Sequence, residues 1–235
     1  MEYKEFSEIL EEKAKKININ KIDTEKFYKY MELLLEWNTK INLTAIVDTK
    51  EIIEKHFIDS CIVNKYIKTG KLIDIGTGAG FPGIPLKIIN NNIEITLLDS
   101  LNKRINFLNE AIKEIGLKNI KTIHGRAEEI GQDIKYREKY DNAIARAVAP
   151  INILLEYLLP FVKIGGICIC MKGQNIEEIA NIDRPLEILG GKIKEIKNIT
   201  IPDTDYKRNI IIIEKIKQTP KRYPRKAGIP KKLPL

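Results

Sequence analysis

The most informative segment of this chain is Leu72-Ile73-Asp74-Ile75-Gly76-Thr77-Gly78-Ala79-Gly80-Phe81-Pro82-Gly83. Its first four residues are mostly apolar and predict a buried strand, and three glycines then follow at every second position. Because glycine has no Cβ, the backbone can take a positive φ there and a ligand can approach it closely. A strand, a glycine turn and a helix in this order are how an α/β sheet presents backbone N–H groups to a nucleotide-like cofactor.

Strands and helices alternate from Lys71 onward. Strands are expected near 71–75, 93–99, 119–123, 141–146 and 164–171, and helices near 83–90, 102–116, 151–160 and 175–189. This alternation predicts an α/β fold with a parallel sheet and helices on both faces. Two further strands, near 191–199 and 209–216, have no obvious crossover helix between them, so we expect an antiparallel hairpin at the sheet edge.

The residues on either side of this α/β region differ from it in pattern. Residues 1–70 carry apolar side chains at helical spacing and predict three helices, with Asp23 and Asp48 as caps of the second and third. Residues 217–235 are basic and contain prolines, which argue against a helix or a central strand. The chain therefore divides into a helical extension (1–70), an α/β domain (71–216) and a tail (217–235).

The composition excludes several classes of protein. With 43% hydrophobic residues among 235 the chain can bury a sizeable core, and it has no apolar run of the roughly 18 residues that a membrane span needs. The charged N-terminus lacks the apolar region of a signal peptide, which predicts a cytoplasmic protein. Cys61, Cys168 and Cys170, with only two histidines in the chain, make a poor zinc site, so we expect core thiols and no metal.

Positive charge is concentrated at the C-terminus. No acidic residue follows Glu214, whereas the tail after it holds eight of the 40 basic residues, and the 32 that remain match the 32 acidic ones. The whole net charge of +8 therefore lies in the last 21 residues. Such a tail favours a polyanionic partner, most simply a nucleic acid. A solvated, disordered terminus is the alternative.

The spacing of the glycines narrows the class of cofactor. A dinucleotide fingerprint, G-x-G-x-x-G, would need glycine at the position of Phe81, so the turn is shaped differently and suits a ligand without a pyrophosphate. Asp99 ends the second strand, 23 residues after Gly76, where a carboxylate can accept hydrogen bonds from both ribose hydroxyls. A helix cap is the plainer interpretation of Asp99 alone. An NAD dehydrogenase is disfavoured by Phe81 and by the lack of a hydride-transfer constellation.

The loop that follows the third strand would line the same crevice. In it, Glu128 could meet an adenine amino group, and the small side chain of Ala127 leaves room for the ring. A solvated turn is the plainer interpretation of this loop. Arg146, at the end of the fourth strand, could bind a guanine oxygen, a phosphate or a carboxylate, or form a strand-end salt bridge.

The glycine turn resembles motif I of class I S-adenosylmethionine-dependent methyltransferases, which also end their sheet in an antiparallel hairpin. Over nearly its full length the chain resembles the ribosomal small-subunit methyltransferase G family, also called glucose-inhibited division protein B. The resemblance rests on an ordered series of segments: Glu36-Trp37-Asn38, Asn42-Leu43-Thr44-Ala45, His56-Phe57, Asp59-Ser60, Gly76–Gly83, Asp99-Ser100-Leu101-Asn102-Lys103-Arg104, Gly125-Arg126-Ala127-Glu128, Ala145-Arg146-Ala147, Met171-Lys172-Gly173 and Arg222-Tyr223-Pro224-Arg225-Lys226-Ala227-Gly228. Thr77 stands where many members carry alanine or another small residue, a mild departure.

The resemblance implies a mainly parallel seven-stranded sheet, with residues 71–216 as the methyltransferase domain. It implies transfer of a methyl group from S-adenosylmethionine to N7 of a guanine in small-subunit (16S) ribosomal RNA. We also expect a monomer that needs no metal or membrane. The cofactor contacts that the resemblance implies are Gly76, Gly78, Phe81, Asp99, Ser100, Leu101, Ala127, Glu128 and Arg146. The RNA contacts expected are Arg146, Lys172, Arg222, Tyr223, Arg225 and Lys226, with Tyr223 stacking on an unpaired base.

The expected chemistry assigns no catalytic side chain. Guanine N7 has an in-plane lone pair and no proton, so it needs no general base, and alignment of N7, methyl and sulfur would carry the reaction. Two other functions fit the motifs. One is a methyltransferase of the same fold that acts on another RNA or on protein, and the other is an RNA-binding module without chemistry, which the intact glycines and Asp99 disfavour.

Overall fold

A computed structural model of the protein describes residues 1–174 and 182–235. Within these residues a seven-stranded sheet has the order β3-β2-β1-β4-β5-β7-β6. The strands are β1 (Gly70–Ile75), β2 (Ile93–Asp99), β3 (Ile120–His124), β4 (Tyr140–Arg146), β5 (Val162–Lys172), β6 (Gly191–Thr200) and β7 (Lys207–Lys215). Neighbours from β3 to β5 are parallel, whereas β7 runs antiparallel between β5 and β6. The predicted sheet and its terminal hairpin are confirmed.

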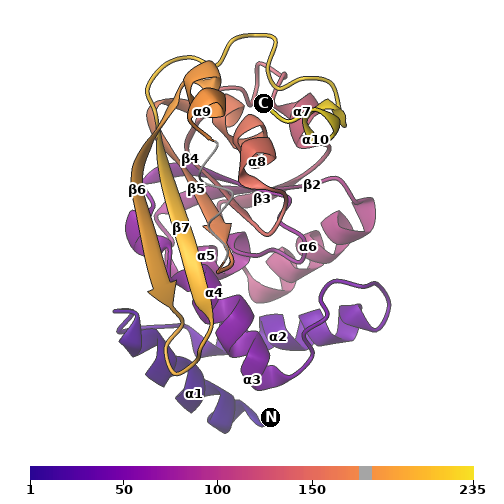
Figure 1. Ribbon diagram of the computed structural model, residues 1–235. Coiled ribbons are helices and arrows are strands. Elements are labelled where there is room, and N and C mark those ends of the chain that lie inside the picture. Colours follow the sequence, from indigo (N-terminus) through magenta and orange to yellow (C-terminus); the bar gives the residue numbers. More distant parts are fainter. Residues whose placement is uncertain (175–181) are drawn as a thin grey trace.

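Helices cover both faces of the sheet, so the molecule has three layers (Figure 1). In the α/β region they are α5 (Gly83–Ile89), α6 (Asn102–Ile115), α7 (Ala127–Ile130), α8 (Ile151–Leu158), the 3-10 turn η3 (Leu159–Phe161) and α9 (Asp183–Leu189). Helices α5 and α6 pack in a buried core on one face of the sheet, and α8 and α9 pack in a second buried core on the other face. The predicted helix over 175–189 is described only in its last part, because residues 175–181 lie outside the described residues.

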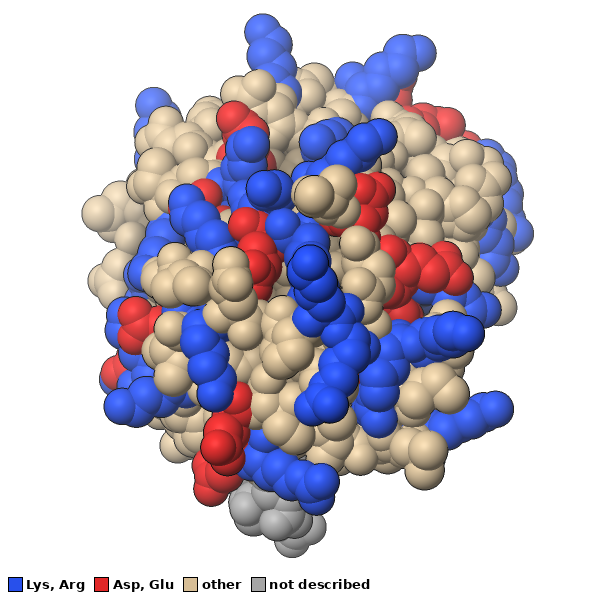
Figure 2. Space-filling view, turned by 90° about the horizontal axis from the view of Figure 1, so that it is seen from above, with Lys and Arg blue, Asp and Glu red and all other residues tan. Residues whose placement is uncertain are grey.

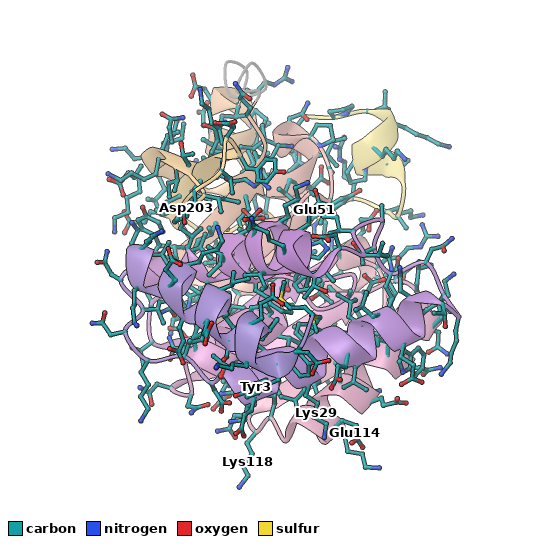
Figure 3. All side chains as sticks on the ribbon, turned by 90° about the horizontal axis from the view of Figure 1, so that it is seen from below. Tyr3, Lys29, Glu51, Glu114, Lys118 and Asp203 are labelled. Atoms are coloured by element: carbon teal, nitrogen blue, oxygen red, sulfur yellow. The ribbon has the colours of Figure 1, made fainter. Side chains whose placement is uncertain are left out.

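The N-terminal helices belong to the same core as α5 and α6. They are α1 (Tyr3–Lys16), α2 (Thr24–Asn38), α3 (Thr49–Ile52), the π-helix η1 (Ile53–Ile58), α4 (Asp59–Cys61) and the 3-10 turn η2 (Asn64–Tyr66). Phe6, Phe27 and Phe57 are fully buried in that core. Seen from below, the N-terminal helices lie in front of the rest of the molecule (Figure 3). Lys29 of α2 forms a salt bridge of 3.3 Å with Glu114 of α6.

The third predicted N-terminal helix differs from expectation in its centre. Asp48 caps its start as predicted, because the side chain accepts a hydrogen bond of 2.9 Å from the N–H of Glu51. The helix then changes to the wider π form over Ile53–Ile58. Such π turns are rare in proteins, and many of those that occur lie at functional sites. This one holds His56, which takes part in the site described below.

The tail is folded onto the body and corrects two expectations. First, it contains a short helix, α10 (Ile229–Lys232), which the prolines seemed to forbid. Pro230 lies in its first turn, where no intrahelical partner is needed for the missing N–H. Second, Lys215 does not add to an exposed basic tail. Its ammonium group is fully buried at the end of β7 and donates to the carbonyl of Leu159 at 2.7 Å.

No helix in the described residues is long and apolar enough to cross a membrane. The three cysteines are buried and unpaired, and burial raises the pKa of the Cys61 and Cys168 thiols and that of Cys170 to about 12. They are therefore core thiols, as expected.

Candidate active site

The glycine turn after β1 has the geometry that its sequence predicts. Gly76, Gly78 and Gly80 have φ values of 67°, 62° and 97°, which other residues rarely adopt. The N–H groups of Gly76 and Thr77 donate to the carbonyl of Leu98, at 2.8 and 3.1 Å, and so fasten the turn to the end of β2. The turn thus lies over the carboxyl ends of two adjacent parallel strands, where α/β sheets bind ligands.

Asp74 holds the turn from beneath. Its Oδ2 accepts hydrogen bonds from the hydroxyl of Thr77 at 2.6 Å and from the N–H of Gly83 at 2.9 Å. The carboxyl group is fully buried, and this burial raises its pKa to about 6. Thr77 replaces the small residue that is common in the family that the chain resembles. Its hydroxyl stabilises the turn, because it donates a hydrogen bond to Asp74.

Asp99 lies where a ribose-binding carboxylate is expected. Only 3% of the residue is exposed, and its oxygens accept hydrogen bonds from the N–H groups of Gly78 and Leu101, each at 2.9 Å. Arg104 approaches at 3.3 Å. A carboxylate has about four lone-pair sites, so Asp99 can accept a hydrogen bond from one further donor. The backbone N–H groups of Gly78, after β1, and Leu101, after β2, fix the orientation of its carboxylate.

A cleft of about 300 Å³ opens beside these groups. Its lining includes Gly76, Asp99, Ser100, Ala127 and Glu128 of the predicted contacts. It also includes residues that were not among the predicted cofactor contacts: Ile75, Leu98, Gly125, Arg126, Val148 and Tyr157. These come from the ends of strands, from the loop after β4 and from α8, so only the tertiary fold gathers them into one wall.

Glu128 is the second buried acid of this cleft, beside Asp99. It is 8% exposed, and its Oε1 accepts a hydrogen bond of 3.0 Å from the N–H of Gly228 in the tail. The hydroxyl of Tyr157 lies near it, and burial together with the charge of Glu128 raises the pKa of Tyr157 to about 12. The tail is therefore part of the support of the cleft, a role that its charge pattern did not suggest.

Arg146 lies in a separate cluster at the end of β4, with Phe81. Its guanidinium lies over the Phe81 ring, 4.9 Å from the ring centroid. It donates to the carbonyl of Lys55 and to Oδ2 of Asp59, both at 2.9 Å, and its other terminal nitrogen is 3.2 Å from Nδ1 of His56. The salt bridge that was one expectation for Arg146 is therefore present, with a partner 87 residues away in the sequence.

His56 completes the cluster as a neutral ring. It stacks on Phe81 with 4.4 Å between ring centroids, and burial and the neighbouring Arg146 lower its pKa to about 3. Because a guanidinium only donates, Nδ1 of His56 must accept, and the ring proton is assigned to Nε2. Nε2 lies 2.8 Å from the hydroxyl of Thr44, so both ring nitrogens are already used.

Two motifs of the N-terminal region support this histidine. Asn38 accepts hydrogen bonds from the N–H groups of Leu43 and Thr44 and donates to the carbonyl of Thr44, and so shapes the loop that presents the Thr44 hydroxyl. The contribution of Asn38, Thr44, His56 and Asp59 was missed by sequence reasoning, although their segments carry part of the family resemblance. The available signal was the membership of these four polar residues in the segments that carry the resemblance.

The predicted RNA contacts differ in burial and in the partners that hold them, although Arg222, Arg225 and Lys226 line one pocket. Tyr223 is 6% exposed and packs in the core of the second sheet face, so its ring is not placed to stack on a base. Arg225 is held by the fully buried Glu156, with Nη2 2.6 Å from Oε2. Lys172 donates to the carbonyl of Ala149 at 3.0 Å. Arg222 and Lys226 remain exposed.

The exposed basic residues of the tail form part of a wider basic surface. Figure 2 shows Lys and Arg side chains spread over the face of the molecule that carries the tail. Arg222, Lys226 and Glu128 also line one shallow pocket, which places these two bases beside the cofactor cleft. The described residues contain no group of three or more His, Cys, Asp or Glu side chains that could hold a metal ion.

The sheet order and the terminal hairpin are those of the class I S-adenosylmethionine-dependent methyltransferase fold. Two solved structures share the fold. The "SAM dependent methyltransferase from Aquifex aeolicus" has a TM-score of 0.53 at 16% identity over 77% of this chain and 98% of its own, and M. jannaschii TYW2 "in complex with AdoMet" has 0.55 at 18% identity over 73% and 80%.

The family is given by sequence. A family model, GidB, described as rRNA small subunit methyltransferase G, matches residues 23–211, and the chain belongs to this family. Proteins named "Ribosomal RNA small subunit methyltransferase G" are similar over nearly the full length. The one from Alkaliphilus oremlandii is 53% identical over 98% of this chain and 99% of its own, and the one from Acetivibrio thermocellus is 55% identical over 93% and 91%.

The cleft fits S-adenosylmethionine. Asp99 keeps acceptor capacity for a ribose hydroxyl, Glu128 offers a buried acceptor, and the walls between them are apolar at Leu98, Ala127 and Val148. A side chain in place of Gly76 would run into Val148 of the opposite wall, since its Cβ would lie 2.8 Å from a Val148 methyl carbon. The need for glycine here is thus steric as well as conformational.

Proposed function

We propose that the protein transfers a methyl group from S-adenosylmethionine to N7 of a guanine in small-subunit (16S) ribosomal RNA. The observation that carries the proposal is the near full-length similarity to relatives named "Ribosomal RNA small subunit methyltransferase G". A cleft lined by Gly76, Asp99, Ser100, Ala127 and Glu128 supports it. The bound cofactor supplies an electrophilic methyl group on a sulfonium. The protein must then hold the cofactor and bring guanine N7 into line with that methyl.

The cofactor would be held by side chains at the ends of three strands. Asp99 would accept a hydrogen bond from a ribose hydroxyl, and Glu128 would accept one from the adenine amino group. Three of the five N–H donors of Arg146 are used by Lys55, Asp59 and His56, which leaves two for an acceptor in the site. That acceptor is the methionine carboxylate of the cofactor, or O6 or a phosphate of the substrate, and the stack on Phe81 fixes the direction of the remaining donors.

Proton transfer has no part in the methyl-transfer step that we propose. Guanine N7 attacks through a lone pair and carries no proton, so a base would have nothing to remove. The one histidine in the cluster, His56, has both ring nitrogens engaged and a strongly lowered pKa. Alignment of reacting groups can lower a barrier by about 7–11 kcal/mol, which makes positioning by the rigid cluster sufficient for much of the rate enhancement.

The ribosomal RNA would be held mainly by phosphate contacts from exposed bases. Arg222 and Lys226 beside the cleft are exposed and would supply such contacts, whose affinity falls steeply with salt. Lys172 at the end of β5 is half-buried and already donates to the carbonyl of Ala149. Tyr223 and Arg225 take no direct part, because they hold the tail in place. We propose a monomer that acts in the cytoplasm on ribosomal RNA or the small subunit.

The test is labelled methyl transfer to several acceptors. Purified protein is incubated with cofactor labelled in the methyl group and with unmethylated small ribosomal subunits, protein-free 16S RNA, large subunits or bulk cell protein. Label in 16S RNA, from one or both of the first two acceptors, is the expected result. Label in large-subunit RNA or in protein would assign another substrate, and transfer to none would leave an RNA-binding protein without this chemistry.

A further inference from the structure

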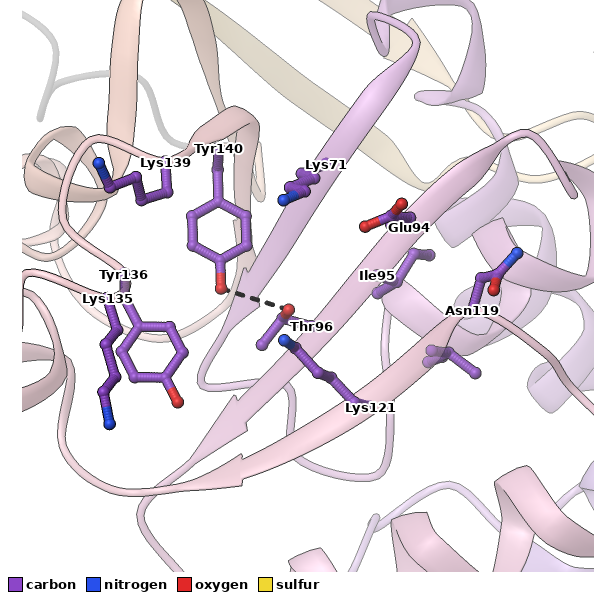
Figure 4. A pocket seen from close by; sticks show the side chains of 11 residues that line it. Lys71, Glu94, Ile95, Thr96, Asn119, Lys121, Lys135, Tyr136, Lys139 and Tyr140 are labelled. Atoms are coloured by element: carbon purple, nitrogen blue, oxygen red, sulfur yellow. Dashed lines mark hydrogen bonds between the residues drawn. The ribbon is translucent and has the colours of Figure 1, made fainter.

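A second hollow lies at the opposite end of the same strands. We call it the amino-end groove; its volume is about 360 Å³, and it is lined by Lys71, Glu94, Ile95, Thr96, Asn119, Ile120, Lys121, Lys135, Tyr136, Lys139 and Tyr140 (Figure 4). Glu94 and Asp99 are five residues apart on β2, a distance of about 16 Å at about 3.3 Å per residue. The groove is thus separate from the cofactor cleft.

The groove exists because one crossover lacks a long helix. Between β3 and β4 the chain forms only the four-residue helix α7 and then turns, whereas α5, α6 and α8 are longer. Lys71 pairs in register with Glu94, and Thr96 with Lys121, so these side chains share one face at the start of the strands. The turn supplies the opposite wall through Lys135, Tyr136 and Lys139, as Figure 4 shows.

The lysines of the groove are not used by the fold. Four of them, Lys71, Lys121, Lys135 and Lys139, are exposed, and within residues 1–174 and 182–235 none of their ammonium groups has a hydrogen-bond or ion-pair partner. Glu94 is the one acid among the lining residues. Four unpaired positive charges around one hollow focus a positive field.

Nearby acids are committed elsewhere. Asp141 pairs with Lys163 at 2.5 Å and accepts from the N–H of Lys71, while Glu138 accepts from the N–H of Thr219 and pairs with the buried Lys215. These contacts keep the carboxylates away from the groove lysines. Salt bridges among surface residues, the ordinary use of lysine on a sheet edge, therefore do not account for the charge.

The polar groups of the groove suit phosphate rather than a base. The hydroxyl of Tyr140 is tied to Thr96 at 3.3 Å and its ring is buried, so it offers no platform for stacking. Ammonium groups act as point charges without the planar fork that reads a base edge. Such a surface binds a polyanionic backbone with little preference for sequence.

We propose that the amino-end groove binds the phosphodiester backbone of a second segment of the RNA substrate, away from the guanine that is methylated. This inference rests on the proposed function for the identity of the RNA, but not for the binding itself. It gives the enzyme two points of contact on one large substrate, so the groove contributes to recognition of the particle and takes no part in methyl transfer.

The test compares two variants that each lose four positive charges. The groove variant carries Lys71→Gln, Lys121→Gln, Lys135→Gln and Lys139→Gln. The control variant carries Lys4→Gln, Lys15→Gln, Lys21→Gln and Lys113→Gln, at exposed lysines whose ammonium groups also have no hydrogen-bond or ion-pair partner among the described residues. Cofactor affinity and the circular dichroism spectrum of both variants establish that the fold is intact.

Binding to small subunits and to a short oligouridylate is measured over a series of salt concentrations. For the groove variant we expect an affinity for both probes about ten-fold or more below that of the wild type, and a shallower salt dependence, since each lost phosphate contact lowers the slope by about 0.7–0.9. Its methyl transfer at saturating subunits stays unchanged. Equal affinities, or an equal loss in the control variant, would overturn the proposal.

Two further outcomes separate this proposal from others. If groove-dependent binding to subunits is not competed by protein-free 16S RNA, the groove binds an acidic protein and the proposal is wrong. If the wild type transfers no methyl group to 16S RNA but the oligouridylate still binds through the groove, the proposed function fails while the RNA-binding groove stands.

Discussion

The two ends of the parallel strands use charge in opposite ways. At the carboxyl ends, Asp59, Asp99 and Arg146 are buried or nearly so, and each is fixed by hydrogen bonds to backbone or to a partner charge. At the amino ends, lysines such as Lys121 and Lys135 are exposed and unpartnered among the described residues. Fixed charges can direct a small cofactor and a reacting base, whereas free charges give salt-dependent affinity for a long polyanion.

The largest expected effect is on stability. It comes from Asp59, the buried carboxylate that holds Arg146 at the carboxyl ends of the parallel strands. Asp59 accepts from Arg146 at 2.9 Å and from Arg208 at 2.8 Å, and its side chain is 2% exposed. Asp59→Asn leaves two guanidinium groups without their counter-charge, and we expect the free energy of unfolding to fall by about 3 kcal/mol or more. Urea denaturation measures it.

The control for Asp59 is an exposed pair of the same kind. Glu36→Gln removes the partner of Lys40, and both side chains are more than half exposed. We expect a loss below about 1 kcal/mol. Equal effects at the two positions would mean that Asp59 is not the centre of a fixed network.

Asp74 should give this end of the sheet a pH-dependent stability. Its folded pKa is about 6 against 3.8 for an ordinary Asp, so the charged form is disfavoured in the fold. The free energy of unfolding of the wild type relative to Asp74→Asn is highest below about pH 4. This difference falls by about 3 kcal/mol as the pH rises to about 6 and stays constant above that pH. Unfolding of both proteins across this range measures the difference, and a constant difference would contradict it.

Asp99 tests the cofactor cleft. Asp99→Ala removes the acceptor for the ribose and the contacts to Gly78 and Leu101, and we expect cofactor affinity to fall about 10- to 100-fold, since each hydrogen bond to a charged group contributes about 1.5–3 kcal/mol. Calorimetry with S-adenosylmethionine measures the affinity. Asp48→Ala, which removes an exposed helix cap far from the cleft in sequence, should bind as the wild type does. Undiminished affinity in Asp99→Ala would remove Asp99 from the site.

Arg146→Lys tests whether direction matters as well as charge. Lysine can still pair with Asp59 but loses the planar fork that contacts Lys55, Asp59 and His56 together. We expect methyl transfer to fall about ten-fold or more, with stability changed by less than Asp59→Asn changes it. Steady-state kinetics and cofactor binding report it. If both are as in the wild type, Arg146 lies outside the reaction.

What the sequence predicted well depends on local geometry. The glycine turn requires positive φ at Gly76 and Gly78, and a carboxylate at the end of the next parallel strand must lie beside it, so the position of Asp99 next to the turn could be predicted from spacing. The hairpin followed from the lack of a crossover helix. These features need little knowledge of distant residues.

What the sequence could not predict depends on long-range partners. Lys215 and Tyr223 were counted with the exposed tail, yet one is buried beside Leu159 and the other in the core. Arg225 pairs with Glu156, 69 residues away. The polar groups of these side chains predict that they are exposed, whereas packing against residues distant in the sequence buries them. Deleting 219–235 would therefore also disturb Glu128 and the cofactor cleft, so it cannot isolate a role in RNA binding.

The most direct test of the account is to map the methyl group on the RNA. Small subunits that lack the modification are incubated with S-adenosylmethionine and either wild type or Asp99→Ala, and the 16S RNA is then cleaved chemically at N7-methylguanine. The account predicts one new cleavage position with the wild type and a much weaker signal at the same position with the variant when the cofactor is limiting. Methylated 16S RNA without cleavage at N7-methylguanine, or no methylated RNA at all, would contradict it.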